Sequence, residues 1–349
     1  MNPYMVSSKY GGCFYVRQFL PMRYNYWNGD YLELGKERDN ADKAKDIRLA
    51  DIVLFHRLDD PAKCEMRDKL KKDGKKIVVD NDDTTLIEEI GSMSAYMEYQ
   101  GMVHDSIKQA DLVTCSTEFL KREYENYTES PVVVLPNCID TDDYPTPKYH
   151  NGKKVRIGFI GSVMYLEDRG VIADLIKELS ERDDIQLVCF GLIPPNMRVN
   201  KNKEYYKRMK NDCDFWDSID CEWQGSVSID RYIPTLNDMR LDMMIMARKD
   251  NYFNRCKSNI KYLEASMLAI PCVCQSFEDG LSPYDNDIID GYNGYLATDE
   301  DEFRNRIEYL IRYKARRRKI GKNAKKYVIE NYNIKDKAYL WEDAYRQLK

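Results

Sequence analysis

The segment from Phe253 to Gln275, FNRCKSNIKYLEASMLAIPCVCQ, holds the most informative spacing of residues that could do chemistry. Ser258 is a preferred helix N-cap and a proline at 271 stops a helix, so we expect a helix from Ser258 to about Ala269. The first turn of a helix has backbone N–H groups without partners and the positive end of the helix dipole. Ser258 and Asn259 therefore mark the tip of a candidate anion site.

Three charged residues of this segment share one face of the predicted helix. Lys257, Lys261 and Glu264 lie at positions i, i+4 and i+7. The lysines can neutralise a diphosphate, and a carboxylate almost two turns further along can accept hydrogen bonds from sugar or ribose hydroxyls. The spacing therefore fits a sugar-nucleotide site. It equally fits a solvated helix face with an ion pair between Lys261 and Glu264.

A glycine pair and an arginine follow the first predicted strand, in the stretch SSKYGGCFYVRQFLP. Gly11 and Gly12 permit a tight backbone turn close to a ligand, and Arg17 could reach a cleft from the next helix. A plain strand-to-helix turn explains the same residues. The chain has no G-x-G-x-x-G motif, so nothing supports a dinucleotide oxidoreductase.

Acidic residues cluster where another predicted strand ends, in IVVDNDDTT. Asp80, Asp82 and Asp83 could take a proton from an acceptor hydroxyl, bind a divalent cation, or cap the helix that follows. His56 follows the apolar strand DIVLF directly and precedes Arg57. Of the three histidines, it is the one we favour for a position in the cleft.

The composition limits the class of protein. The 349 residues include 54 Lys or Arg and 59 Asp or Glu, and the net charge of −5 argues against a protein that coats nucleic acid. No apolar run is long enough for a membrane span, and the N-terminus lacks the features of a signal peptide. The ten cysteines form no C-x-x-C pair, which indicates reduced thiols. We therefore expect a cytoplasmic protein without a metal site.

Short apolar, β-branched runs alternate with helical stretches, which is the pattern of parallel sheets covered by helices. Strands are predicted at 4–7, 51–55, 76–80, 112–115 and 132–135, and then at 155–161, 185–191, 241–247, 271–275 and 294–297. A polar, proline-containing linker at about 141–153 separates the two series. The sequence thus predicts an α/β fold of two doubly wound, Rossmann-like domains, 1–150 and 151–332, with a closing helix at 333–349. Their cleft faces the carboxyl ends of both sheets, where such sheets bind ligands.

Several motifs, in the right order over much of the chain, resemble those of the GT-B retaining glycosyltransferases of the large family four. They are ADLVTCST (110–117), VVVLPNCID (132–140), RIGFIGS (156–162), the WQGSV stretch (223–245), KSNIKYLEA (257–265), DGYNGYLA (290–297) and the closing IGKNAKKYVIENYNIKDKAYLWEDAY. The resemblance is strongest to a sub-branch that reads "F-N-x-x-K-S-x-x-K-x-L-E".

The resemblance implies a GT-B fold with a deep interdomain cleft and C-terminal helices that cross back to the N-terminal domain. It implies transfer of a sugar from a nucleoside diphosphate to a hydroxyl acceptor, with retention of configuration. UDP-glucose is our first choice of donor, as a co-substrate and without a tightly bound cofactor. The N-terminal domain would hold the acceptor and the C-terminal domain the donor.

The same resemblance distributes the candidate residues. On the diphosphate we expect Lys257, Ser258, Asn259 and Lys261 from the helix tip, together with Gly161, Ser162 and Arg169 from the loop that the resemblance indicates. On the acceptor side it implies Gly11, Gly12, Arg17, Asp82 and Asp83. The candidate catalytic residues are Glu264, Lys261 and His56.

Two departures from the family pattern favour a second hypothesis. The first Glu of the usual Glu-x7-Glu motif falls at Cys256, and the loop after Gly161 lacks the usual Arg/Lys pair, with Arg169 as a shifted substitute. A catalytically silent module that binds a nucleotide sugar or a glycan would also fit.

The acceptor stays open at this level. A glycan, a lipid-linked acceptor, a protein, or hydroxylated DNA bases of the kind that phage-encoded relatives modify are the alternatives, and the net charge weighs against DNA. The basic run 314–326 could contact an anionic membrane or another polyanion, or could be a solvated helix face.

Overall fold

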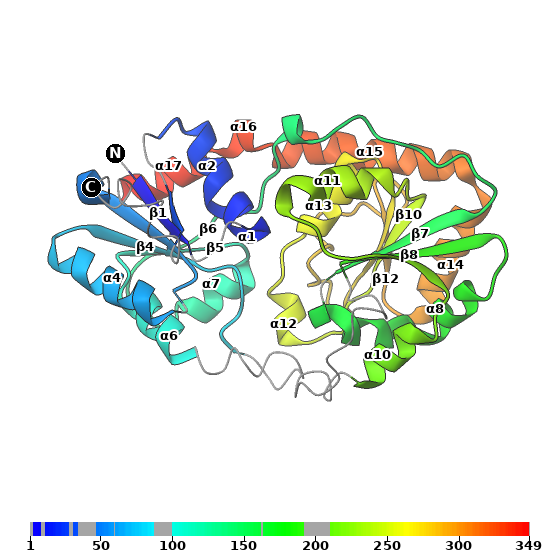
Figure 1. Cartoon of the computed structure of the whole chain (residues 1–349), viewed down its shortest axis with the longest axis horizontal. Helices are drawn as coiled ribbons and strands as arrows, with labels where there is room; N and C mark the ends of the chain where they lie inside the picture. The colour runs from blue at the N-terminus through cyan, green and yellow to red at the C-terminus, as the bar shows by residue number, and fades with distance from the viewer. Residues whose placement is uncertain are drawn as a thin grey trace.

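The computed structural model describes residues 3–7, 11–27, 31–33, 47–58, 60–86, 100–161, 163–191 and 210–348. Within these ranges the chain forms two parallel sheets, one in each half of an elongated molecule (Figure 1). Helices cover both faces of each sheet. The α/β class predicted from the sequence is confirmed.

The N-terminal sheet has the strand order β2-β1-β3-β4-β5-β6 among the described residues. The strands are β1 (Pro3–Ser7), β2 (Tyr31–Glu33), β3 (Ile52–His56), β4 (Lys76–Asp80), β5 (Leu112–Cys115) and β6 (Val132–Val134). The helices are α1 (Gly12–Phe14), η1 (Tyr15–Phe19), α2 (Leu20–Tyr24), η2 (Ile47–Leu49), α4 (Pro61–Lys72), α6 (Gln100–Gln109) and α7 (Glu118–Tyr124). Every residue of β3 is buried, as expected for a parallel strand between two helix layers.

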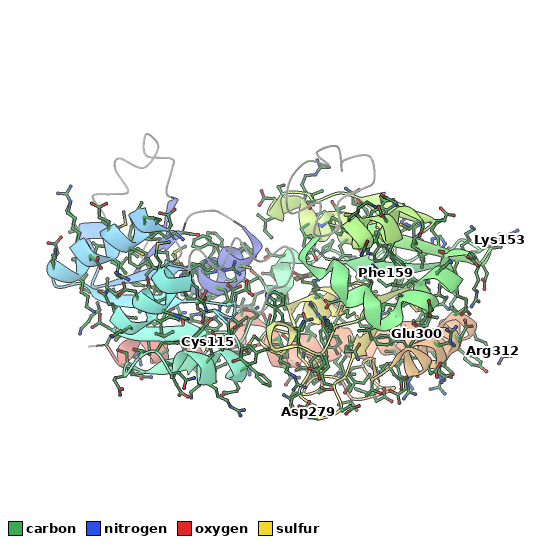
Figure 2. All side chains as sticks on the ribbon, turned by 90° about the horizontal axis from the view of Figure 1, so that it is seen from below. Cys115, Lys153, Phe159, Asp279, Glu300 and Arg312 are labelled. Carbon is green, nitrogen blue, oxygen red and sulfur yellow. The ribbon has the colours of Figure 1, made fainter. Side chains whose placement is uncertain are left out.

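The C-terminal sheet has the order β12-β11-β10-β7-β8-β9 in the described part of the chain. Its strands are β7 (Val155–Ile160), β8 (Ile185–Phe190), β9 (Cys221–Gln224), β10 (Met243–Met246), β11 (Cys272–Gln275) and β12 (Tyr295–Ala297). Its helices are η4 (Val163–Ile172), α8 (Ala173–Ser180), α10 (Lys210–Asp217), α11 (Ile229–Asp238), α12 (Tyr252–Arg255), α13 (Ile260–Met267), α14 (Glu300–Arg312) and α15 (Lys314–Tyr332). Figure 2 shows Phe159 of β7 and Cys115 of β5 in the two separate halves.

The chain passes between the halves at two places that meet. After β6 it runs through η3 (Thr141–Asp143), and after α15 it returns to the N-terminal half as α16 (Ile334–Lys337) and α17 (Tyr339–Arg346) (Figure 1). Ile139 and Asn333 form a parallel bridge where the two passages lie side by side. Trp341 and Tyr345 of α17 are buried against the N-terminal core. No helix in the described ranges has the length and apolar character that a bilayer span requires.

The helix that the sequence places at Ser258–Ala269 is shorter in the structure. It runs from Ile260 to Met267 with Asn259 at the N-cap, and the prediction that Ser258 caps it is wrong. The Ser258 hydroxyl instead accepts a hydrogen bond from Asn137 Nδ2 at 2.8 Å. Ala269 has a φ of +54°, so the helical conformation has ended before it.

Candidate active site

A pocket lies at the carboxyl ends of β7 and β10 in the C-terminal half. Ile160 and Gly161 line it from the end of β7, and Arg248 follows β10. Lys261 enters the same pocket from the first turn of α13. In parallel sheets this edge is where ligands bind, so the fold alone favours this pocket as a binding site.

Arg248 is held rigidly on the pocket wall. Its side chain is 5% exposed, and Nη1 lies 3.2 Å from Asp168 Oδ2 and 3.3 Å from Asn254 Oδ1. Asp168 Oδ1 also accepts from Asn254 Nδ2 at 2.8 Å. Sequence reasoning missed Arg248, although its position directly after the apolar run LDMMIMA, at the end of a predicted strand, was the available signal.

Lys261 is the second cation of the pocket. Its Nζ donates to the carbonyl of Ile160 at 2.8 Å. Burial, followed by the charge of Arg248, lowers the pKa of Lys261 well below its usual value, against the opposing charges of Asp168 and Glu264. An anion bound between Lys261 and Arg248 would reverse this shift, because it would favour the charged ammonium.

Gly161 and Arg169, two of the residues that the sequence suggests for the diphosphate, also line the pocket, and Ser162 lies outside the described residues. Arg169 stacks over the ring of Phe215 at 4.1 Å from the centroid, and its Nη2 lies 3.4 Å from the carbonyl of Asn211. A guanidinium in this position adds positive charge to the pocket wall.

Glu264 lies one turn further along α13 than Lys261 and contacts a tyrosine. The Tyr232 hydroxyl donates to Glu264 Oε2 at 2.9 Å. Burial raises the pKa of Glu264 from 4.5 to about 7, with Tyr232 and Lys261 acting in the opposite direction. The carboxyl group is therefore a hydrogen-bonding group whose charge changes near neutral pH.

The three residues of the KSN sequence at 257–259 make contacts away from this pocket. Lys257 precedes α13, stacks over the Phe253 ring at 3.9 Å, and forms an ion pair with Asp83 of the N-terminal half. Asn259 Nδ2 donates to Asp287 Oδ2 at 2.7 Å. The expectation that Lys257, Lys261 and Glu264 share one helix face is wrong for Lys257, because the helix begins after it.

The acidic cluster at the end of β4 forms a chain of ion pairs across the two halves. Arg57 donates from Nε to Asp82 Oδ1 at 2.7 Å and from Nη2 to Asp83 Oδ2 at 2.9 Å. His56 Nε2 lies 3.5 Å from Asp82 Oδ1. Burial by itself would raise the pKa of Asp82. The Arg57 charge and the contact with His56 outweigh burial and hold this pKa well below its usual range. His56, Asp82 and Asp83 thus lie together, and through Lys257 they reach the C-terminal half.

Among the described residues, no group of three or more His, Cys, Asp or Glu side chains is arranged to hold a metal ion. The two aspartates of the cluster that could ligate a cation instead carry arginine and lysine partners.

Arg17 does not lie open on the acceptor side. Its side chain is 0% exposed, and its Nη2 and Nε donate to Asp80 at 2.7 and 3.2 Å. Nη1 donates to Asn137 Oδ1 at 3.1 Å and to the carbonyl of Leu135. The expectation that Arg17 faces the acceptor is corrected by this burial: its guanidinium ties the end of β4 to the chain that follows β6.

The glycine pair lies near the opposite half of the molecule. A Cβ at Gly12 would lie 3.7 Å from Ile229 Cδ1, the first residue of α11, whereas one at Gly11 would meet no atom within 4 Å. Gly12 therefore faces α11 of the C-terminal half, and the space beside Gly11 is open.

Cys256 is an interdomain packing residue. It is 1% exposed, belongs to the apolar core of the N-terminal half, and its carbonyl accepts from Thr117 Oγ1 at 3.1 Å. Burial, followed by the charge of Glu123, raises the pKa of the Cys256 thiol to about 12. A glutamate here would be buried beside Glu123, which gives a physical reason for the departure from the family pattern.

Comparisons with solved structures identify the fold. Sucrose-phosphate synthase from Thermosynechococcus elongatus matches with a TM-score of 0.68 and 13% identity, over 100% of this chain and 99% of that one. Anabaena HepE, solved with UDP and glucose, gives 0.65 and 10% identity over 99% and 100% of the two chains. A glycosyltransferase from Rickettsia africae gives 0.63 and 14%, over 100% and 98%. No protein-family model and no curated protein sequence matches.

At these identities the likeness establishes the fold. The chain has the GT-B architecture that the sequence predicts, and the match to sucrose-phosphate synthase and HepE spans 99–100% of those two chains.

Proposed function

We propose that this chain is a glycosyltransferase that takes a sugar from a nucleoside diphosphate donor. The observation that carries the proposal is the pairing of Arg248 and Lys261 in a pocket at the carboxyl edge of the C-terminal sheet. Arg248 carries a fixed charge, and an anion beside Lys261 would restore the charge that burial and Arg248 disfavour, so the pair favours a ligand with concentrated negative charge. The shared fold with glycosyltransferases supports a nucleotide sugar as that ligand.

In this proposal the diphosphate lies against the N-terminus of α13. Lys261 and Arg248 would contact its oxygens, and Gly161 would permit a close approach of the backbone. Glu264 would accept hydrogen bonds from donor hydroxyls, with Tyr232 fixing its orientation. Lys257 would join the diphosphate after leaving Asp83, so that donor binding and the acceptor side are linked.

The reaction breaks the bond between the anomeric carbon and the diphosphate oxygen, and the electron pair stays on the diphosphate. Positive groups fixed before the reaction stabilise that developing charge, which is the main electrostatic demand of the step. The acceptor hydroxyl forms the new bond to the anomeric carbon and loses its proton. We assign the proton acceptor to His56, whose Nε2 lies 3.5 Å from Asp82 Oδ1, so that the carboxylate stabilises the charge that His56 gains. Closure of the two halves would exclude water.

UDP-glucose is the first donor to test, with retention of configuration as the stereochemical expectation. HepE was solved with UDP and glucose, which supports the choice of nucleotide and sugar. The division of labour is part of the proposal: residues 1–150 on the acceptor side, 151–332 on the donor side, and 333–349 as the closing segment.

The test is a donor screen on the full-length protein. UDP, ADP, GDP and TDP and their glucose derivatives are compared by thermal shift, and sugar release without acceptor is measured for each donor that binds. Binding with hydrolysis supports the enzyme, and binding without any turnover supports the silent nucleotide-sugar module. No binding by the wild type, or binding that Lys261→Ala leaves unchanged, would contradict the donor site.

We propose the acceptor only as a compound with a free hydroxyl group. Glycan, lipid-linked, protein and modified-DNA acceptors are each tested in a separate turnover assay. Exposed cations on α15, including Lys314, Lys319 and Lys322, suit an anionic acceptor or membrane surface. Comparing turnover with and without phosphatidylserine vesicles separates the membrane arm from the others.

A further inference from the structure

Asp287 is a buried carboxylate that the proposed reaction does not use. It lies between β11 and β12 and is 6% exposed. Its Oδ2 accepts from Asn259 Nδ2 at 2.7 Å, and its Oδ1 accepts from the hydroxyls of Tyr327 at 3.1 Å and Tyr332 at 2.5 Å. All three partners donate to the carboxylate, whereas an amide here could still accept from the two tyrosines on its oxygen but would turn an N–H group toward the Asn259 amide.

The first partner belongs to the proposed donor site. Asn259 is the N-cap of α13, and its carbonyl accepts from the backbone N–H groups of Tyr262 at 2.8 Å and Leu263 at 3.2 Å. The hydrogen bond to Asp287 fixes the Asn259 side chain. It thereby orients the first turn of the helix whose N-terminus would face the diphosphate.

The other two partners belong to the last turns of α15, where the chain leaves the C-terminal half. The carbonyl of Tyr332 accepts from Ile139 N at 2.9 Å, and Ile334 N donates to the carbonyl of Ile139 at 2.9 Å. Tyr332 therefore lies at the point where both passages between the halves meet. Burial, followed by the charge of Asp287, raises the pKa of Tyr327 to about 12, so this hydroxyl remains a donor.

Helices α13 and α15 are also packed tightly against each other, side by side in Figure 1. A Cβ added at Gly321 of α15 would overlap the backbone carbonyl of Ala269, just past the end of α13. Since this contact leaves no free space between the two helices at the end of α13, we expect a shift of α13 as a whole to displace α15 as well.

We propose that Asp287 is a positioning residue that couples donor binding at the N-terminus of α13 to the orientation of the crossover segment around Asn333, and hence to closure of the two halves. The inference rests on the proposed donor site. It adds that a carboxylate remote from the chemistry, together with Tyr327 and Tyr332, sets how strongly the donor drives closure.

The experiment uses the full-length protein with UDP as the probe. UDP affinity is measured by calorimetry, and the radius of gyration with and without UDP by small-angle scattering. The variants are Asp287→Asn, Tyr332→Phe and the double variant, and Tyr339→Phe is the matched control because Tyr339 is 54% exposed on α17. Coupling predicts that Asp287→Asn and Tyr332→Phe each weaken UDP binding by about fivefold or more and reduce the UDP-dependent compaction.

The double variant separates coupling from two independent defects. Because Asp287 and Tyr332 act through one hydrogen bond, the double variant should bind UDP no more weakly than the Asp287→Asn variant alone. If Asp287→Asn does not fold, Tyr332→Phe alone decides the question. Wild-type UDP affinity and compaction in a folded Tyr332→Phe protein would overturn the coupling, whereas failure of the wild type itself to bind any nucleoside diphosphate would overturn the donor site.

Discussion

Replacing Glu264 with glutamine should change how the stability of the protein depends on pH. Glu264 is half-buried on α13 and accepts a hydrogen bond from Tyr232 at 2.9 Å, and burial raises its pKa from 4.5 to about 7. A glutamine oxygen can accept the same hydrogen bond from Tyr232. Glu264→Gln therefore removes the charge and keeps the contact.

The sign follows from the raised pKa. Because folded Glu264 holds its proton up to a higher pH than the unfolded chain does, its stabilising contribution is complete below pH 4.5 and is lost as the pH rises through about 7. Each unit of pKa difference corresponds to about 1.4 kcal/mol, so the loss amounts to about 3 kcal/mol of unfolding free energy. The Glu264→Gln variant has no charge to lose stability in this way. Above pH 7 its unfolding free energy should therefore exceed that of the wild type by about 3 kcal/mol more than it does at pH 4.5.

Thermal unfolding in a series of buffers from pH 4.5 to 8.5 measures the effect. A difference of about 3 kcal/mol should shift the Tm difference between variant and wild type by several degrees across the series. Glu278→Gln is the matched control, because Glu278 is an exposed carboxylate of the same half. Parallel profiles for the wild type and the Glu264→Gln variant would refute the conclusion that Glu264 is buried at a cost to its charge.

Four further outcomes follow from the site. Lys261→Ala should lower donor affinity roughly 10- to 150-fold, because a charge-assisted hydrogen bond is worth about 1.5–3 kcal/mol. Lys326→Ala, on the exposed surface of α15, should change donor affinity little, and titration of both variants with UDP compares them. Asp83→Asn removes the interdomain partner of Lys257 and should tighten UDP binding several-fold, and an unchanged or weaker affinity would mean that Lys257 does not reach the donor. Cys256→Glu buries a carboxylate in the N-terminal core, so it should lower the Tm and should not raise turnover, which melting and kinetics check together. Turnover should persist in EDTA, because lysine and arginine supply the positive field at the pocket, and activity that returns only on adding magnesium or manganese would contradict this mechanism.

Local sequence signals predicted most of the sheet, because a strand buried on both faces is a continuous apolar run. The runs that became β3, β8 and β10 were recognised on this basis. The short strands β2, with sequence YLE, and β9, with sequence CEWQ, were not predicted. Both strands lie at an edge of their sheet, and in β9 burial is incomplete, so its sequence is mixed in polarity and lacks the apolar run of a central strand.

The types of residue at the candidate site were also readable from the sequence, but their partners were not. Helical spacing placed Lys257, Lys261 and Glu264 on one face, and this holds only for a helix that begins before Lys257. In the structure the Ser258 hydroxyl accepts a hydrogen bond from Asn137, and the Asn259 amide donates one to Asp287. The helix therefore begins after these residues, and Lys257 forms an ion pair with Asp83. A local preference was overridden by partners that are distant in sequence.

The sequence by itself thus determined the α/β class, the alternation of strands and helices, and the segment that carries the charged residues, since all of these depend on neighbours within a few positions. Tertiary structure alone decided which of those charges meet. Arg248 pairs with Asp168, 80 positions away, and Asp287 joins Asn259 to Tyr332. The physical reason is that ion-pair and hydrogen-bond partners depend on how the strands and helices pack against one another. This packing brings together residues that are far apart in sequence, and no periodic pattern along the chain records it.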